Sequence, residues 1–174
     1  MINKITKKLP FLNNGVGQVA LVVKDLDHTV EMLHAVFGVG PWHFYTYEKP
    51  LVRHMTYYGQ EADYGMRIAL SYFGQSRVEL IEVKHGKSVY QDFIDRQGYG
   101  LHHLGFRIEN MQAALQLAEE AGYPMIQDGS GFGLDGDGHY AYLDTEKDFG
   151  FLIELIETPK RRNPPEKIYP PESQ

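Results

Sequence analysis

The sequence predicts an α+β protein built from two copies of a β-α-β-β-β module. The main observation is an internal repeat, in which VGQVALVVKDLDHTVEMLHAVFG at 16–38 resembles LHHLGFRIENMQAALQLAEEAG at 101–122. Each copy begins with a short apolar run and continues with apolar residues at helical spacing. A second matched pair, RVELIE at 77–82 and FLIELIE at 151–157, follows later in each half. The two halves therefore share one order of elements.

Polar residues and glycines mark the ends of the two repeated helices. Asp25 or Asp27 in the first half and Asn110 in the second are residue types that accept hydrogen bonds from the first turn of a helix. Gly38 and Gly122 stand where each apolar pattern stops, and glycine is the usual residue just past a helix C-terminus. These signals predict helices at equivalent places in both halves.

Runs rich in Tyr and Phe fill most of the remaining chain and have strand-like composition, at 42–47, 55–58, 66–73 and 139–143. Between them, the glycine-rich stretch at 128–139 predicts a flexible loop that borders a cavity and acts as a lid. The expected segments are an N-terminal extension at 1–14, a first module at 15–85, a linking helix at 86–99 capped by Ser88, a second module at 100–158 and an extended Pro-rich tail at 159–174.

Composition limits the possible classes of function. The 174 residues are 43% hydrophobic, which is ample for a globular core, and carry a net charge of -6. No block of Lys and Arg precedes the tail, which argues against nucleic acid as a partner. No apolar run approaches the roughly 20 residues that cross a bilayer, and the N-terminus lacks the apolar segment of a secretion signal. With no cysteines for disulfides, we expect a cytoplasmic protein that does not bind membranes.

Strand alternation places four polar side chains on one face of the predicted sheet. When the halves are aligned, Gln18 matches His103 and Glu79 matches Glu154. Because neighbouring side chains on a strand point to opposite faces, all four should lie opposite the face that the helices cover. The same rule predicts that His102 points away from His103 and forms a hydrogen bond near the start of its strand. Four oxygen or nitrogen donors should thus converge from equivalent strands.

The stretches VGQVALVVKDLD, GLHHLGFRIENM and AYLDTEKDFGFLIELIE resemble the vicinal oxygen chelate superfamily, which includes glyoxalase I, methylmalonyl-CoA epimerase, extradiol dioxygenases and bleomycin-resistance proteins. This resemblance covers residues 15–158. It implies that the two modules form a U-shaped open β-barrel, and that the protein is a homodimer. It also implies one divalent metal, held by Gln18, Glu79, His103 and Glu154. These donors suit Zn, Ni, Co or Mn.

The resemblance to glyoxalase I and the epimerase implies an isomerase, epimerase or lyase that moves a proton next to a carbonyl through a metal-bound enediolate. The substrate would be a small molecule with adjacent oxygens, with Glu154 as the first choice of base and Glu79 as the second. The alternative is a metal-free small-molecule binder of the bleomycin-resistance type. A dioxygenase is disfavoured because non-haem iron oxygenases use two histidines, and Gln18 takes one of those places here.

The substrate itself is left open by departures from both relatives. Positions through which glyoxalase I binds glutathione hold Tyr99, Val83 and Val22 in this chain. The segment GMRIALSYF at 65–73 has no carboxylate where the epimerase has a catalytic glutamate.

Five side chains are candidates for contacts with the substrate. Arg67 and Arg107 are expected on the face of the site by alternation, where a guanidinium would bind a carboxylate or phosphate. Trp42, Tyr72 and Tyr142 belong to the aromatic set from which the cavity lining is expected.

Overall fold

The computed structural model describes residues 8–171, so residues 1–7 of the predicted N-terminal extension and residues 172–174 of the tail lie outside the described residues. The strands are β1 (Gln18–Val22), β2 (Trp42–Tyr47), β3 (His54–Tyr57), β4 (Gln60–Glu61), β5 (Gly65–Phe73), β6 (Ser76–His85), β7 (Gly100–Arg107), β8 (Met125–Phe132), β9 (Gly138–Leu143), β10 (Leu152–Glu157) and β11 (Lys167–Tyr169). The helices are the 3-10 helix η1 (Pro10–Asn14) and the α-helices α1 (Leu26–Phe37), α2 (Val89–Gln97), α3 (Met111–Glu120) and α4 (Glu146–Phe149).

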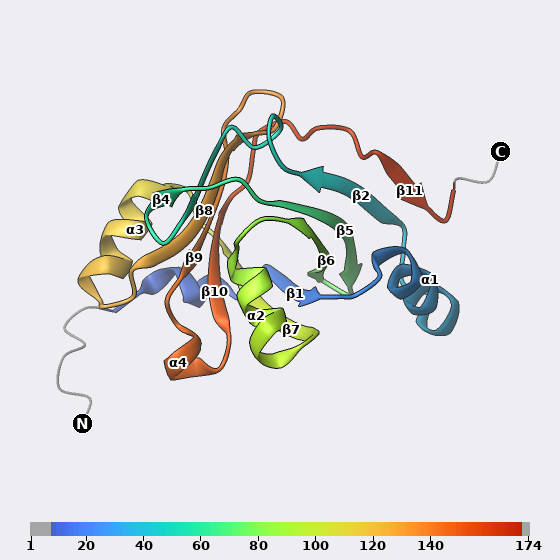
Figure 1. The fold of residues 1–174 in the computed structure, drawn as a ribbon, viewed down its shortest axis with the longest axis horizontal. Helices are drawn as coiled ribbons and strands as arrows, with labels where there is room; N and C mark the ends of the chain where they lie inside the picture. The colour runs from blue at the N-terminus through green and yellow to red at the C-terminus, as the bar shows by residue number, and fades with distance from the viewer. Residues whose placement is uncertain (1–7, 172–174) are drawn as a thin grey trace.

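All the strands belong to one mixed sheet that curls into a half-barrel (Figure 1). Their order is β11-β2-β5-β6-β1-β7-β10-β9-β8-β3-β4, with β1 and β7 antiparallel at the centre. On one side of this centre lie β6, β5 and β2, and on the other lie β10, β9 and β8 in the corresponding places. Each half thus contains one βαβββ module, which confirms the predicted α+β architecture. Within residues 8–171, no helix has the length and apolar character required to cross a membrane.

Each half also adds strands to the edge of the other half. The strand expected at 55–58 forms as β3, but together with β4 it pairs with β8 of the second module rather than inside the first. In return, β11 from the tail pairs antiparallel with β2 of the first module. The tail is therefore extended, as predicted, and both edges of the sheet end in strands of only three or two residues. Short edge strands present few unpaired backbone groups to other chains.

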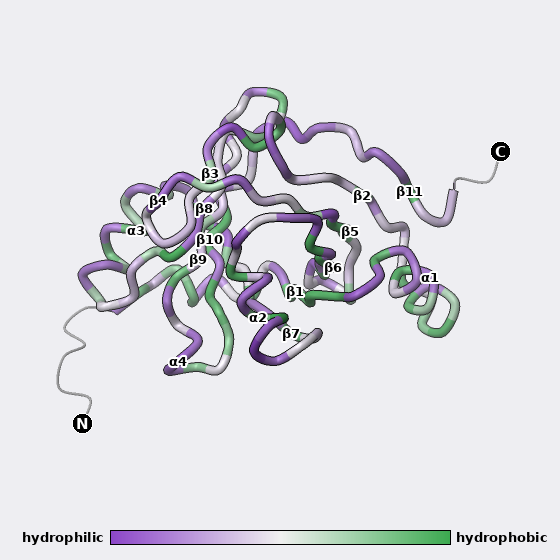
Figure 2. Tube along the Cα trace, in the orientation of Figure 1, coloured by the Kyte–Doolittle hydropathy of each residue, from purple (hydrophilic) through white to green (hydrophobic). Residues whose placement is uncertain are grey.

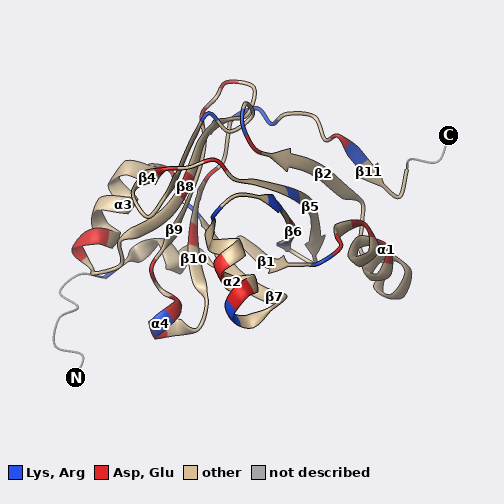
Figure 3. Ribbon diagram, viewed as in Figure 1, with Lys and Arg blue, Asp and Glu red and all other residues tan. Residues whose placement is uncertain are grey.

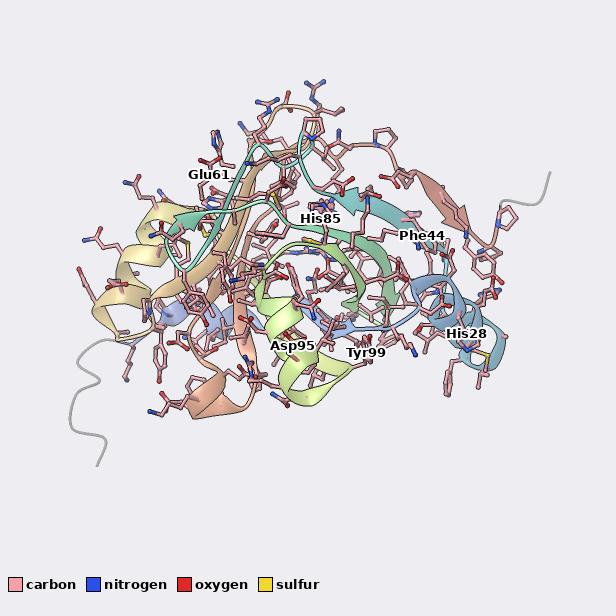
Figure 4. The ribbon with its side chains drawn as sticks, in the orientation of Figure 1. His28, Phe44, Glu61, His85, Asp95 and Tyr99 are labelled. Carbon is pink, nitrogen blue, oxygen red and sulfur yellow. The ribbon has the colours of Figure 1, made fainter. Side chains whose placement is uncertain are left out.

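Two helices cover the convex face of the sheet. Helix α1 packs on the first module, where Leu26 and Val30 contact a cluster that includes Phe44, which Figure 4 labels on β2 near α1. Helix α3 packs on the second module through Met111 and Ala118. The apolar spacing read from the sequence predicts the packed face of α3, but in α1 its last residue, Phe37, is 73% exposed. Figure 2 shows hydrophobic residues along α1, β1 and β10.

Helix α2, the predicted linking helix, lies on the concave side of the sheet (Figure 1). The Ser88 hydroxyl accepts a hydrogen bond from the backbone of Gln91 at 3.3 Å, as expected for its cap. Tyr90 and Phe93 of α2 enter the core cluster of the concave face. The concave side is therefore filled at this end of the half-barrel and opens at the other.

The predicted caps of the repeated helices are also present. The Asp25 carboxylate accepts from the backbone N–H of His28 at 3.0 Å, and the Asn110 side chain accepts from Ala113 at 2.9 Å. Gly38 ends α1 in the left-handed conformation with φ 67°. Capping of this kind uses only neighbours in the sequence, so it could be predicted from local residue types.

The glycine-rich stretch at 128–139 does not form the lid that the sequence suggests. Its first part completes β8 and its last residues begin β9, so only 133–137 form a turn. A Cβ atom on Gly129 would lie 2.3 Å from the Tyr140 ring, so this glycine gives the ring the space it occupies. Glycine within a strand often marks such a close approach rather than a flexible loop.

Candidate metal centre

The four predicted donor residues lie together on the concave face, on the four central strands. Gln18 is on β1, Glu79 on β6, His103 on β7 and Glu154 on β10. The strand register aligns them, because Ala20 of β1 pairs with Glu79 on one side and with His103 on the other. All four are buried, with at most 8% of their surface exposed. The alternation rule therefore predicted the convergence of these side chains correctly.

Three of these residues place possible ligand atoms around one point. The Nε2 atom of His103 lies 3.1 Å from Oε2 of Glu154 and 3.5 Å from Oε2 of Glu79. One ligand atom from each of the three residues lies within 4.8 Å of the others. Metal–ligand bonds of about 2.0–2.2 Å separate neighbouring ligands of one ion by about 3 Å. The Glu79–His103–Glu154 cluster therefore fits a single divalent ion, and carboxylate and imidazole groups are ligands that such ions accept.

Gln18 presents its amide nitrogen, not its oxygen, to the cluster. Its Nε2 donates to Oε2 of Glu79 at 2.8 Å and to Oε2 of Glu154 at 3.0 Å. Its Oε1 accepts from Nε of Arg77 at 2.6 Å. An amide coordinates a metal through oxygen, so Gln18 would become a fourth ligand only after its amide turned and gave up the Arg77 bond.

The two carboxylates favour the charged form of His103. Complete burial of the ring opposes protonation, but the nearby charges and hydrogen bonds of Glu154 and Glu79 outweigh it and raise the pKa of His103 to about 9. Protonated His103 thus takes the place of a cation between two acids. A divalent ion would replace this proton, since a histidine ligand must be neutral at the coordinating nitrogen.

His102 does not point away from His103, so this part of the alternation prediction is wrong. The pairing of β1 with β7 shifts between Ala20 and Leu21, and His102 is the extra residue of a β-bulge. A bulge interrupts the alternation of side chains. Both imidazoles therefore reach the concave side, where their Nδ1 atoms lie 2.9 Å apart.

The contacts of His102 determine which ring is the donor. Its Nε2 lies 3.3 Å from the carbonyl oxygen of Val89, so this nitrogen carries a proton. Burial lowers the pKa of His102 well below its usual value, and the positive charge of His103 lowers it further. The neutral ring then accepts at Nδ1 from the Nδ1–H of His103. His102 thus fixes the orientation of the His103 ring, which faces the carboxylates. A metal-binding histidine is commonly oriented in this way by a hydrogen bond to its other ring nitrogen.

The two carboxylates differ in how completely they are hydrogen-bonded. The hydroxyl of Tyr142 donates to Oε1 of Glu154 at 3.0 Å, and it also lies 2.8 Å from the hydroxyl of Tyr90. Burial and then the charge of Glu154 raise the pKa of Tyr142 well above its usual value, so it remains a donor. Among residues 8–171, Oε1 of Glu79 has no hydrogen-bond partner. Glu79 therefore keeps one oxygen free to accept a proton.

Gly105 gives the cluster its space. It pairs with Gln18 on one side and with Glu154 on the other. A Cβ atom at this position would lie 2.9 Å from the Gln18 Cβ and 2.9 Å from Oε2 of Glu154. Contacts this short would displace these side chains, so the site depends on a residue that has no side chain.

Two adjacent pockets lie beside the cluster on the concave side. The inner pocket, of about 40 Å³, is lined by Gln18, Glu79, Glu154, Tyr47, Tyr140 and Tyr142 among others. The outer pocket, of about 590 Å³, is lined by His43, Tyr45, Tyr72, Arg77, Arg107 and Arg162 among others. Both pockets are lined by Leu70, Arg77, Thr158 and Arg162, so they lie next to each other. The tail therefore contributes Arg162 to the walls of the site, which its Pro-rich composition did not suggest.

Two predicted substrate-binding residues lie outside these pockets. Arg67 pairs in register with Glu82, not with the face of Glu79, and its guanidinium lies 2.7 Å from Asp27 on the convex side. Trp42 is also on the convex side, where it packs in the cluster beneath α1 and donates to the carbonyl of Val39 at 2.8 Å. The predictions that Arg67 shares the face of the site and that Trp42 lines its cavity are wrong. For Arg67, the alternation was counted without knowing the register of the neighbouring strand. For Trp42, membership of the aromatic set gave no information about the face on which the side chain lies.

The other candidates do reach the pockets. Tyr142 lines the inner pocket, and Arg107 and Tyr72 line the outer one. Arg77 was missed, although it stands two residues before Glu79 and alternation places both on one face.

The structure is a half-barrel of two βαβββ modules with a possible metal site at its centre. Sequence comparison identifies the family to which a protein of this class belongs. Residues 17–142 match the profile of the glyoxalase/bleomycin resistance protein/dioxygenase superfamily. The match covers more than half of the chain, which therefore belongs to this superfamily. No curated protein has significant sequence similarity to the chain.

Solved structures with this fold include methylmalonyl-CoA epimerases. The enzyme from Mycobacterium tuberculosis has a TM-score of 0.61 and 21% sequence identity, over 84% of this chain and 89% of that one. A hypothetical protein from Bacillus halodurans has a TM-score of 0.59 and 19% identity, over 86% of this chain and 97% of its own. A Streptomyces coelicolor epimerase bound to 2-nitronate-propionyl-CoA has a TM-score of 0.54 and 19% identity, over 82% and 96%. At these identities the similarity is one of fold.

Proposed function

We propose that this protein is a divalent-metal-dependent isomerase or epimerase that moves a proton on the carbon next to a carbonyl. The observation that carries the proposal is the buried Glu79–His103–Glu154 cluster at the end of a pocket. The epimerase structures that share the fold support the same type of reaction. The metal would be Zn, Ni, Co or Mn, with Gln18 as a fourth ligand if its amide turns.

The bound ion would act as a Lewis acid that polarises the substrate carbonyl. Glu79 and Glu154 would form the acid–base pair, because they lie on different strands on either side of the Gln18 amide. Oε1 of Glu79 is free to take a proton, whereas Tyr142 holds Oε1 of Glu154 and orients that carboxylate. The sequence resemblance ranks Glu154 first as base, but the contacts favour Glu79 as the carboxylate that meets the substrate first. Burial of both groups excludes bulk water, which protects a carbanion-like intermediate.

The reaction can be tested by deuterium incorporation. Metal-loaded protein is incubated in D2O with acyl-CoA thioesters branched next to the carbonyl and with 2-hydroxy and 2-oxo acids. We expect deuterium at the carbon next to the carbonyl, and a rate lower by about 10²–10⁴-fold in Glu79→Gln and Glu154→Gln, the usual loss when an acid or base is removed. Glu157→Gln, three residues farther along β10 and not at either pocket, is the matched control. Exchange that persists at the wild-type rate in both site variants would refute the assignment.

A metal-free binding protein is the second candidate, and one observation favours it. The Gln18 amide and His103 already contact one oxygen of each carboxylate, Oε2 of Glu79 and of Glu154, without an ion. Metal content separates the two functions: protein purified without a chelating column should hold about one ion per chain, and His103→Ala should hold none. Stoichiometric metal in His103→Ala would exclude the Glu79–His103–Glu154 cluster as the metal site. Wild-type protein that takes up no metal would favour the metal-free binding protein over the metal-dependent enzyme.

A further inference from the structure

Three arginines converge on the outer pocket without acidic partners. Arg77, Arg107 and Arg162 come from β6, β7 and the tail, and all three line this pocket. Among residues 8–171, none of them forms an ion pair with a carboxylate. Arg67, Arg96 and Arg161, which lie elsewhere, each pair with an acid. Figure 3 shows basic residues in the segment between β10 and β11, which the sequence gives as Lys160, Arg161 and Arg162.

Arg77 connects this group to the candidate metal centre. It is only 7% exposed, and in the part of the chain that the structure describes only its Nε donor is hydrogen-bonded, to the Gln18 oxygen at 2.6 Å. Arg107 and Arg162 line the same pocket, so Arg77 is a largely buried cation with two like charges nearby. A buried cation beside two like charges is unfavourable unless an anion joins them. Metal in the cluster would neutralise the two glutamates and leave the arginines with still less compensation.

The sizes of the pockets show where an anion would sit. The inner pocket, of about 40 Å³, has room for only a small reacting group beside the cluster. The outer pocket, of about 590 Å³, holds the rest of a small molecule between the arginines and the side chains of Tyr45 and Tyr72. Arg77 lines both pockets, so a ligand that occupied both would lie beside this residue.

We propose that Arg77, Arg107 and Arg162 form an anion clamp that binds a carboxylate or phosphate group of the substrate, at the end remote from the reacting carbon. The anion site is inferred from the pocket alone. Only the statement that its ligand is the substrate rests on the proposed function. The substrate class is then an anionic small molecule that carries its metal-binding oxygens at one end and a second anionic group at the other. The two charged ends would fix its direction in the pocket.

The clamp can be tested without catalysis. Full-length protein is stripped of metal with a chelator, desalted and titrated calorimetrically with inorganic phosphate or with propionate at low ionic strength, where screening is weak. We expect one anion per chain, and binding at least about tenfold weaker in Arg107→Gln and in Arg162→Gln, because each loses a charge-assisted hydrogen bond. Both side chains are exposed, so these variants should fold.

Arg161→Gln is the matched control, because it changes the same charge at the adjacent position, where the guanidinium pairs with Asp135 outside the pocket. It should bind within about twofold of wild type. Tighter binding of phosphate or of propionate identifies the group that the clamp accepts. The proposal is overturned if neither anion binds, or if Arg161→Gln weakens binding as much as Arg162→Gln. Anion binding without proton exchange would refute the proposed reaction and support the clamp. Proton exchange without anion binding would support the reaction and refute the clamp.

Discussion

Two arginines on neighbouring strands show how the faces of the sheet differ. Arg67 on β5 lies on the convex face, 2.7 Å from Asp27 and 3.3 Å from Glu82. Arg77 on β6 lies on the concave face, and within residues 8–171 its guanidinium forms one hydrogen bond, to the neutral amide of Gln18. The convex charges are matched within the protein, whereas the concave charges leave donors free for a ligand. Unmatched, partly buried charge in a pocket is therefore the better indicator of a binding site.

The largest effect should come from the convex core. Trp42 is fully buried beneath α1. We expect Trp42→Ala to lower the free energy of unfolding by about 3–5 kcal/mol, the usual cost of removing a large aromatic side chain from a core. Urea denaturation measures this change, with Trp42→Phe as the milder control. The folded fraction should bind metal as wild type does; loss of metal there would show that the two faces are not independent.

A smaller effect is expected from the second histidine of the concave face. His102→Leu removes the acceptor for Nδ1–H of His103. Metal affinity should then fall by about 10–100-fold, the usual loss when a residue that hydrogen-bonds a metal ligand is replaced. His102→Gln keeps an acceptor oxygen and should retain most of the affinity. Competition with a fluorescent chelator measures both constants. Equal affinity in His102→Leu and wild type would mean that the contact between the rings does not orient His103.

The smallest effect should come from Arg67. Arg67→Gln should cost less than about 1 kcal/mol of stability, because its partner Asp27 is 37% exposed and solvent screens the pair. Hydrogen bonds from Lys167 and then Arg67 lower the pKa of Asp27 below its ordinary value of about 3.8. The ion pair of Asp27 with Arg67 therefore adds to the free energy of unfolding above the ordinary pKa of the carboxyl. This addition is lost as the pH falls through the lowered pKa of Asp27. Thermal unfolding should differ between wild type and variant at pH 7 and coincide in strong acid; altered metal binding would contradict the convex placement.

The sequence was sufficient wherever a prediction depended on regular alternation or on neighbours in the chain. The repeat placed Gln18, Glu79, His103 and Glu154 on one face because the strands that carry them alternate regularly at those positions. Alternation failed at His102, where the strand contains an extra residue. It also failed at Arg67, because the two-residue turn after Phe73 sets the register of β5 against β6, and a shift of one residue reverses every side chain.

Partners that are distant in the sequence could not be predicted in this way. Composition identified the strand at 55–58, but nothing local to it indicates that it pairs with β8. The glycines of β8 concealed a strand, because the Tyr140 ring that covers Gly129 is on a different strand. The contribution of Arg162 was missed for the same reason: the position of the tail is decided by the free edge of β2.

The exchange of edge strands has a consequence for the order in which the chain is completed. The ribosome makes β2 long before β11, so the edge of β2 stays unpaired until about 120 further residues have been added. Closing a loop of this length carries an entropic cost that local hairpins such as β5–β6 do not have. The last wall of the pocket, with Arg162, is thus assembled after both halves of the sheet. A nascent chain would complete its acidic cluster, with Glu154, before Arg162 completes the group of three arginines.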